Sequence, residues 1–339
     1  MASKTLAVAY RPKTWSEVEG QGSTKVILQQ QLDSGEIRNS YLFCGASGCG
    51  KTTCARIFAN EVNKGQGTPI EMDAASHSSV DDVREIIKMA KTRSMDSEYK
   101  CFIIDECHSI SNTGWQAMLK LIEEPPAKSI FIFCTTNPEK IPKTILNRVQ
   151  RYDFKRIPYE NIVRRMQVII QTENDKSDEI QYTPEALDYI ARQSKGGMRD
   201  ALALLDKCLA YSLDLTLDNV LTALELSDTD TFINLTEAVL EQDRQTVIDI
   251  IERVYADGED MKQFIKQYMN FILDVTKWYI CEDFKYTQLA ETKEMKDWLS
   301  KHDDLDTLLD LLDTVISIDA DIKFSSSAKE YIEVQLITF

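Results

Sequence analysis

The chain has 339 residues, of which 43% are hydrophobic and 28% are charged, and its net charge is −16. This composition indicates a large buried core, and the length predicts two or three domains. No apolar run reaches the roughly 18 residues of a membrane span, and the first residues show no secretory pattern. We therefore expect a soluble, cytoplasmic protein without membrane contact.

The negative charge is unevenly distributed. Residues 1–160 hold 21 Lys and Arg against 19 Asp and Glu, whereas residues 161–339 hold 18 against 36. A surface for nucleic acid would therefore be a local patch on the first half. The eight cysteines form no CxxC pair and no cluster at zinc spacing, which predicts reduced core thiols.

Glycine and proline mark a change in architecture along the chain. Nine of the twelve glycines precede residue 115, and no proline follows Pro184. The first half alternates short apolar runs with helical patterns, which predicts an α/β domain with a parallel sheet. The predicted buried strands are 41–44, 101–105 and 130–135.

The second half has a helical pattern throughout. One amphipathic helix begins at Pro184 behind the capping residue Thr183, and another follows the pair Gly196-Gly197. The three predicted domains are an α/β nucleotide-binding domain, 1–160, a helical lid domain, 161–226, and an all-α domain, 227–339.

A phosphate-binding loop follows the first predicted strand. Residues 45–52, Gly-Ala-Ser-Gly-Cys-Gly-Lys-Thr, match the pattern GxxxxGK[ST], and helical composition follows them. Glycines let backbone N–H groups surround phosphates, and a helix N-terminus favours negative charge. Lys51 would reach the β- and γ-phosphates of ATP, and Thr52 would bind Mg²⁺. The residues predicted to hold the phosphates are Gly45, Ser47, Gly48, Cys49, Gly50, Lys51, Thr52 and Thr53.

Polar residues end the next two predicted strands. Asp105 and Glu106 close an apolar run about fifty residues after the phosphate loop. Asp105 would bind Mg²⁺, and Glu106 would polarise the attacking water as general base. Thr136 follows the third strand and is our choice for the residue that senses the γ-phosphate, with Thr135 as the alternative.

The motifs described so far are common to many P-loop ATPases, and several further segments indicate a particular family. Residues 10–15, Tyr-Arg-Pro-Lys-Thr-Trp, precede residues 18–21, Val-Glu-Gly-Gln. Residues 71–76 read Glu-Met-Asp-Ala-Ala-Ser, and residues 119–126 read Leu-Lys-Leu-Ile-Glu-Glu-Pro-Pro. Together these segments closely resemble the γ/τ family of ATPase subunits in the bacterial DNA polymerase III clamp loader. The resemblance carries motifs over roughly residues 5–226 and only helical character beyond them.

The resemblance implies an AAA+ fold, in which a helical lid and an all-α collar domain follow the nucleotide domain. It places Tyr10, Arg11, Pro12 and Val18 over the adenine and ribose of ATP. Arg148 stands where the family has an arginine that enters the neighbouring subunit's ATP site, although both flanking residues differ, and Arg151 is the alternative. Arg199 corresponds to the lid arginine that contacts the γ-phosphate of its own subunit.

Two departures from the family pattern stand out. The four-cysteine zinc module is replaced by the short segment 63–68, which contains no cysteine, so we predict no zinc. The long C-terminal extension is also absent. Both fit a compact version of the subunit, and one hypothesis is that a phage encodes it.

The resemblance also implies the partners. These are the other clamp-loader subunits, in a pentameric assembly with several copies of this chain, a sliding clamp, primer–template DNA and, indirectly, DNA polymerase. ATP would be hydrolysed at subunit interfaces. Arg84, Lys88 and Lys91 recur at helical spacing, and some of them are predicted to contact DNA phosphates, although a solvated helix face is the favoured account of any one of them taken alone.

Three other functions compete with this one. A branch-migration helicase motor shares the phosphate loop but carries a winged-helix module in place of a large helical third domain. A non-hydrolysing scaffold subunit of the same loader typically lacks the phosphate loop. A replication-initiator ATPase would carry a basic terminal helix-turn-helix.

Overall fold

The computed structural model describes residues 5–77, 79–176, 179–224, 228–301, 304–325 and 327–339. The chain forms two compact units, of which the first comprises Met1–Asp178 and Ser194–Asp206 and the second comprises Glu179–Gln193 and Lys207–Phe339. The division into three domains remains a prediction, and its boundary between residues 226 and 227 lies outside the described residues.

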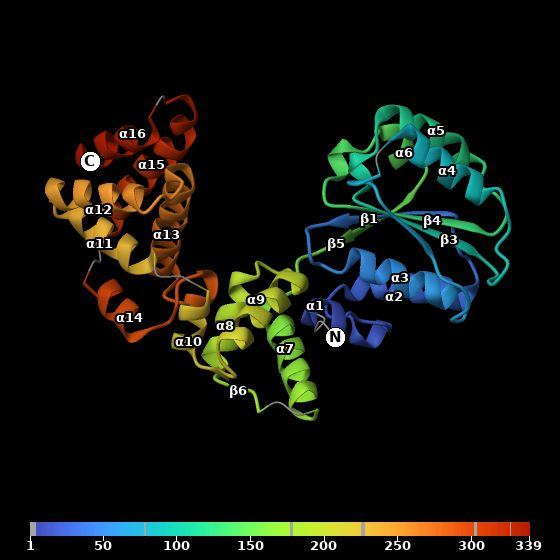
Figure 1. Cartoon of the computed structure of the whole chain (residues 1–339), viewed down its shortest axis with the longest axis horizontal. Helices are drawn as coiled ribbons and strands as arrows, with labels where there is room; N and C mark the ends of the chain where they lie inside the picture. The colour runs from blue at the N-terminus through green and yellow to red at the C-terminus, as the bar shows by residue number, and fades with distance from the viewer. Residues whose placement is uncertain (1–4, 78, 177–178, 225–227, 302–303, 326) are drawn as a thin grey trace. The chain divides into compact units, whose positions relative to one another are not determined.

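A five-stranded parallel sheet forms the centre of the first unit (Figure 1). The strand order is β2-β3-β4-β1-β5, with every neighbouring pair parallel. The strands are β1 (Ser40–Gly45), β2 (Ile70–Asp73), β3 (Lys100–Asp105), β4 (Ser129–Thr135) and β5 (Gln150–Phe154). The three predicted strands are confirmed as β1, β3 and β4. The two edge strands, β2 and β5, were not predicted.

Helices cover both faces of this sheet. Figure 1 shows α2 and α3 on one face and α4, α5 and α6 on the other. The helices of the first unit are α1 (Leu6–Ala9), α2 (Gly22–Ser34), α3 (Lys51–Val62), α4 (Val80–Ala90), α5 (Asn112–Glu123), α6 (Lys143–Leu146), α7 (Tyr159–Asn174) and the start of α9 (Met198–Tyr211). Short 3-10 helices lie at Trp15–Glu17, Cys107–Ser109 and Pro138–Lys140.

The side chains of β1 explain the two layers. Tyr41 and Phe43 belong to the core cluster that contains Phe58 of α3. Leu42 and Cys44 belong to the opposite cluster, with residues of α4 and α5. Successive side chains of a strand point to opposite faces, so a strand covered on both faces has to be apolar throughout. The continuous apolar runs of the sequence are therefore the signature of this buried parallel sheet.

The second unit is mainly helical. Its helices are α8 (Pro184–Gln193), α10 (Leu217–Ala223), α11 (Asp228–Leu240), α12 (Arg244–Ala256), α13 (Met261–Cys281), α14 (Lys293–Leu299), α15 (Leu305–Asp321) and α16 (Ala328–Ile337). The pair β6 (Gln181–Tyr182) and β7 (Asp214–Leu215) is parallel, and 3-10 helices lie at Phe284–Tyr286 and Ile322–Phe324. The long helix α13 places Phe264, Tyr268 and Ile272 in the core of this unit.

The cysteines and the helices were both the subject of predictions from the sequence. Seven cysteines are buried as predicted, whereas Cys281, the last residue of α13, is exposed, so it is not a core thiol. Within the described ranges, every helix is too short or too polar to cross a bilayer.

Gly45 provides a test of the sheet edge where β1 meets β5. A Cβ atom at this position would lie 2.4 Å from the carbonyl oxygen of Phe154, which is backbone of β5. We expect Gly45→Ala to destabilise the protein by roughly 1–3 kcal/mol, because the overlap forces the backbone to shift. Urea unfolding measures this difference.

Gly22→Ala is the matched control. A Cβ at Gly22, the first residue of α2, meets no atom within 4 Å. Its unfolding midpoint should equal or slightly exceed that of the wild type, since alanine favours helix more than glycine does. Equal midpoints for Gly45→Ala and the wild type would contradict the close approach of β1 and β5.

Candidate nucleotide site

The phosphate-binding loop connects β1 to α3. Gly48 and Gly50 have φ angles of 71° and 99°, which L side chains rarely adopt. The side chain of Lys51 is buried, and its Nζ donates hydrogen bonds to the carbonyl oxygens of Gly45 and Ala46, at 2.9 and 2.8 Å. The loop thus encloses one positive charge at the N-terminus of α3, an arrangement suited to anionic phosphates.

The hydroxyl of Thr52 meets the carboxylate that ends β3. Thr52 Oγ1 donates to Asp105 Oδ2 at 2.8 Å, and Asp105 Oδ1 accepts from the backbone N–H of Glu106 at 3.0 Å. Hydroxyl and carboxylate oxygens are hard donors of the kind that Mg²⁺ prefers, and Mg²⁺ commonly uses one or two protein ligands together with phosphates. Thr52 and Asp105 therefore fit a magnesium ion bound to a nucleotide.

Glu106 lies beside the ends of two strands. Its backbone has a φ of 45°, an uncommon left-handed conformation for a residue with a side chain. Its Oε2 accepts a hydrogen bond from Thr136 Oγ1 at 3.1 Å and lies 3.2 Å from Nδ1 of His108. The carboxylate is thus oriented by Thr136, which follows β4, and by His108, which lies in the 3-10 helix after β3.

The two threonines after β4 differ in their surroundings. Thr135 is fully buried, with its hydroxyl 3.2 Å from His108 Nδ1 and 3.0 Å from the backbone N–H of Asn137. Thr136 instead directs its hydroxyl to Glu106, the predicted general base. This contact favours Thr136 over Thr135 as the sensing residue, although that role remains a prediction.

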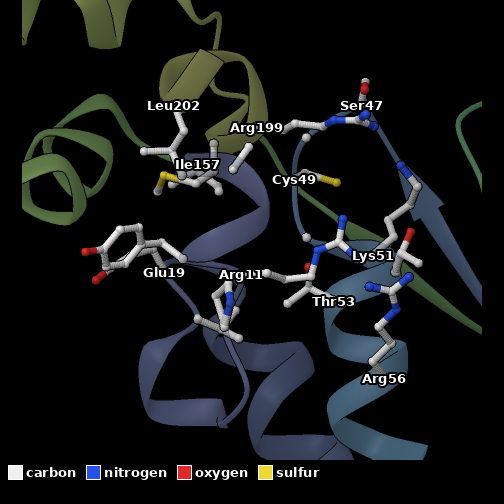
Figure 2. A pocket seen from close by; sticks show the side chains of 18 of the residues that line it. Arg11, Glu19, Ser47, Cys49, Lys51, Thr53, Arg56, Ile157, Arg199 and Leu202 are labelled. Atoms are coloured by element: carbon white, nitrogen blue, oxygen red, sulfur yellow. The ribbon is translucent and has the colours of Figure 1, made fainter. Parts of the chain in front are cut away.

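A pocket joins these groups to the N-terminal segment, which we define as residues 5–21, and to the start of α9. In Figure 2, the side chains of Arg11, Lys51 and Arg199 come from these three parts of the chain. The predicted nucleotide residues that line the pocket are Tyr10, Arg11, Pro12, Val18, Ser47, Gly48, Cys49, Gly50, Lys51, Thr52, Thr53, Asp105, Glu106 and Arg199. Gly45 does not line it and contributes its carbonyl oxygen to Lys51 instead.

Gln21 connects the N-terminal segment to the phosphate loop. Its side-chain amide donates to the carbonyl oxygen of Cys49 at 3.2 Å and to that of Lys155, and it accepts from the N–H of Lys155 at 3.0 Å. The thiol of Cys49 donates to the carbonyl oxygen of Ala46 at 3.0 Å, and burial raises its pKa. A neutral thiol adds no repulsion to a bound phosphate.

The start of α9 touches the phosphate loop. The backbone N–H of Met198 donates to the carbonyl oxygen of Gly48 at 3.0 Å. A Cβ at Gly48 would lie only 3.0 Å from Cα of Gly197, so the glycine at position 48 allows the two backbones to approach. Arg199 follows directly and reaches the pocket from the helix that this contact fixes.

Arg148 lies outside the pocket of its own chain. Its guanidinium is 2.7 Å from Oε1 of Glu123 and donates to the carbonyl oxygen of Thr144 at 2.7 Å. A residue that acts on a neighbouring subunit need not line its own pocket, so this position leaves the prediction open. The alternative, Arg151, lies on β5, where its guanidinium is 2.7 Å from the carboxylate of Asp153.

The predicted basic helix face is α4. The helix buries Val83, Ile86 and Ala90 and leaves the side chains of Arg84, Lys88 and Lys91 exposed. Arg84 also pairs with Asp81 at 2.9 Å, so acidic groups partly offset this face. The DNA contact remains a prediction.

Sequence patterns did not identify several residues of the pocket. These are Ala7, Glu17, Glu19, Arg56, Ile157, Arg165, Met198 and Leu202. Glu19 belongs to the quoted segment 18–21, and Glu17 lies between that segment and residues 10–15, but neither was predicted to bind the nucleotide. Ile157 precedes the predicted lid, whereas Arg165 and Leu202 belong to it. None of these three residues lies in a recognised motif, and they reach the pocket through tertiary folding.

A metal site built from protein ligands alone would need several His, Cys, Asp or Glu side chains close together. Among the described residues, no three or more His, Cys, Asp or Glu side chains are grouped to hold a metal ion. The single carboxylate of the Thr52–Asp105 pair is compatible with magnesium, and the absence of zinc stays a prediction.

Three family models match successive parts of the chain. DNA polymerase III, delta subunit, matches residues 68–158. DNA polymerase III clamp loader subunit, ATPase lid domain, matches residues 161–214. DNA polymerase III subunits gamma and tau domain III matches residues 215–339.

Individual proteins with similar sequences are also DNA polymerase III subunits. DNA polymerase III subunit gamma/tau of Mycobacterium tuberculosis is 34% identical, over 75% of this chain and 48% of that protein. DNA polymerase III subunit tau of Bacillus subtilis is 30% identical, over 99% of this chain and 63% of that protein. This chain thus spans about half to two thirds of these relatives.

A solved structure supports the fold. The Thermotoga maritima RuvB Holliday junction branch migration motor has a TM-score of 0.53 and 20% identity, over 68% of this chain and 79% of that one. At that identity the likeness concerns the fold alone. Because the successive family models and these relatives agree, the chain belongs to the DNA polymerase III gamma/tau family of clamp-loader subunits, which have an AAA+ ATPase fold.

Proposed function

We propose that this chain is an ATPase subunit that opens a ring-shaped sliding clamp and places it on primer–template DNA. The observation that carries this proposal is the hydrogen bond between Thr52 and Asp105, which brings the phosphate loop and the acidic strand end into one pocket with Lys51 and Glu106. That combination suits hydrolysis of a magnesium-bound nucleoside triphosphate.

The side chains that act on the phosphates, on Mg²⁺ and on the attacking water within one chain have separate roles in this proposal, and all of them except Thr136 line the pocket. Lys51 and the backbone N–H groups of the loop bind the β- and γ-phosphates, and Thr52 and Asp105 bind Mg²⁺, which neutralises charge on the phosphate oxygens. Glu106 orients the attacking water and accepts its proton. Thr136 and Arg199 contact the γ-phosphate from β4 and from α9.

The base and ribose of ATP occupy the other end of the pocket. Tyr10, Arg11, Pro12 and Val18 of the N-terminal segment line that end, and apolar residues of the lid face them. A pocket that combines apolar walls with polar side chains suits a nucleoside.

Assembly extends the site beyond one chain. We propose that Arg148 enters the ATP site of the next subunit in a pentameric loader that contains several copies of this chain. The proposed domains are 1–160, the helical lid 161–226 and the all-α collar 227–339, which joins the subunits. ATP would favour the clamp-holding conformation, and hydrolysis would reverse that preference and release the loaded clamp to the polymerase.

The alternatives are less well supported. A branch-migration motor shares the fold, but the gamma and tau domain III model covers residues 215–339, where a motor would need its DNA module. A scaffold subunit without activity would not need the intact Lys51, Thr52, Asp105 and Glu106. The decisive experiment measures ATP hydrolysis by the chain with its loader partners, with and without clamp and primed DNA. Stimulation by both together supports the loader, and stimulation by four-way DNA without a clamp supports the motor.

Glu106→Gln tests the general base. We expect ATP binding to remain and hydrolysis to fall by about 100-fold or more, because the amide cannot accept the proton. Single-turnover hydrolysis and equilibrium binding separate the two effects. Glu139→Gln, an exposed carboxylate outside the pocket, should behave as the wild type. Normal turnover in Glu106→Gln would remove Glu106 from the mechanism.

Arg148→Ala tests catalysis across the subunit interface. Loss of a positive charge from the transferring phosphoryl group should reduce hydrolysis in the assembled loader by roughly 10³–10⁵-fold, with ATP affinity retained. Arg151→Ala, which removes the nearby edge-strand arginine, serves as the comparison. If only Arg151→Ala abolished activity, the role would pass to Arg151.

The exposed basic residues of α4 provide a test of DNA contact. Replacing Arg84, Lys88 and Lys91 together by alanine should weaken binding of primed DNA by the loader and flatten its salt dependence by about 0.9 in log–log slope for each lost phosphate contact. Lys128→Ala, an exposed lysine paired with Glu98, is the control for charge alone. An unchanged slope in the triple variant would exclude this face.

A further inference from the structure

The base side of the pocket has polar contacts that phosphate chemistry does not explain. Tyr10 lines the pocket, yet its hydroxyl lies within a group of polar side chains near the end of α7. The phenol donates to Oε1 of Glu173 and accepts a hydrogen bond from Nζ of Lys176 at 2.8 Å. Lys176 Nζ is also 2.9 Å from the same Glu173 oxygen and 5.0 Å from the centre of the Tyr10 ring.

The pKa shifts of Tyr10 and Glu173 are consistent with hydrogen bonds among all three side chains. Burial and the bond to Glu173 raise the pKa of Tyr10, whereas the Tyr10 and Lys176 hydrogen bonds lower the pKa of Glu173. At neutral pH the network therefore joins a neutral phenol, a carboxylate and an ammonium. The Glu173 side chain is only 21% exposed, which shields these charge-assisted bonds from water.

Two more hydrogen bonds tie the same segment to the lid helices. Arg165 of α7 donates to the carbonyl oxygen of Tyr10 at 3.1 Å. Asp206 of α9 accepts from the backbone N–H of Leu6 at 2.8 Å. Because α9 also carries Arg199, the segment on the base side is bonded to the helix whose arginine reaches the phosphate side.

The N-terminal segment depends on such contacts for its position. Its helix α1 has four residues, far fewer than an isolated helix requires for stability. Its placement over the pocket must therefore come from tertiary bonds, of which the Tyr10–Glu173 bond holds the side chain of a residue that lines the pocket.

We infer that Glu173 and Lys176 are positioning residues for the nucleoside part of the nucleotide, acting through Tyr10. They fix the N-terminal segment against α7, so that this wall is already in place when the base and ribose bind. Asp206 completes the connection to α9 and thereby links the nucleoside wall to the helix of Arg199. This inference rests on the proposed nucleotide pocket and does not depend on clamp loading.

Tyr10→Phe, Glu173→Gln and the double variant test the inference in the full chain. Calorimetry would measure binding of ATP and of inorganic tripolyphosphate, which lacks the nucleoside. We expect each single variant to raise the Kd for ATP by about 5-fold, and the double variant to add little, since all three weaken the same bond. Tripolyphosphate has no base or ribose to contact the N-terminal segment, so it should bind all variants as it binds the wild type.

Glu160→Gln, the same chemical change at the exposed first turn of α7, is the matched control and should bind ATP normally. Wild-type ATP affinity in Glu173→Gln, or equal weakening for ATP and tripolyphosphate, would overturn the inference. If the wild type bound no ATP at all, the proposed function itself would fail, and this outcome is distinct from a selective loss in the variants.

Discussion

The site depends on the parallel alignment of β1, β3 and β4, which places their carboxyl ends at one edge of the sheet. The register pairs Cys44 at the end of β1 with Thr135 at the end of β4. The phosphate loop, Asp105 and Thr136 therefore emerge within reach of one another, although almost a hundred residues separate the first from the last. In open α/β sheets this edge is where ligands generally bind, because loops and helix N-termini converge there.

The start of α9 and the N-terminal segment form further walls of the pocket at the carboxyl edge of the sheet. Met198 is bonded to the phosphate loop and Gln21 to both the loop and the end of β5, so three distant segments share backbone contacts around the pocket. The glycine at position 48 permits the close approach of the loop to the start of α9. In the proposed function, this short path transmits a change at the γ-phosphate to α9, as a nucleotide-driven conformational change requires.

The solved structure bears on the fold of this chain, whereas the sequence relatives bear on its family. RuvB, a branch migration motor, shares the fold at 20% identity. Relatives named as DNA polymerase III gamma/tau or tau subunits share 30–34% identity with this chain, and the match to the Bacillus subtilis protein extends over 99% of this chain. A common fold can serve several functions, so the likeness to RuvB does not bear on function.

The sequence by itself determined the buried strands, the phosphate loop and the acidic strand end, because both-sided burial and phosphate binding leave strong local patterns. It did not reveal β2 and β5, whose edge positions expose alternate residues and so remove the continuous apolar run. Only the tertiary structure brought Ile157, Arg165 and Leu202 to the pocket and joined Tyr10 to Glu173. These contacts link residues far apart in the chain, and no local spacing encodes which side chains will meet across packed helices.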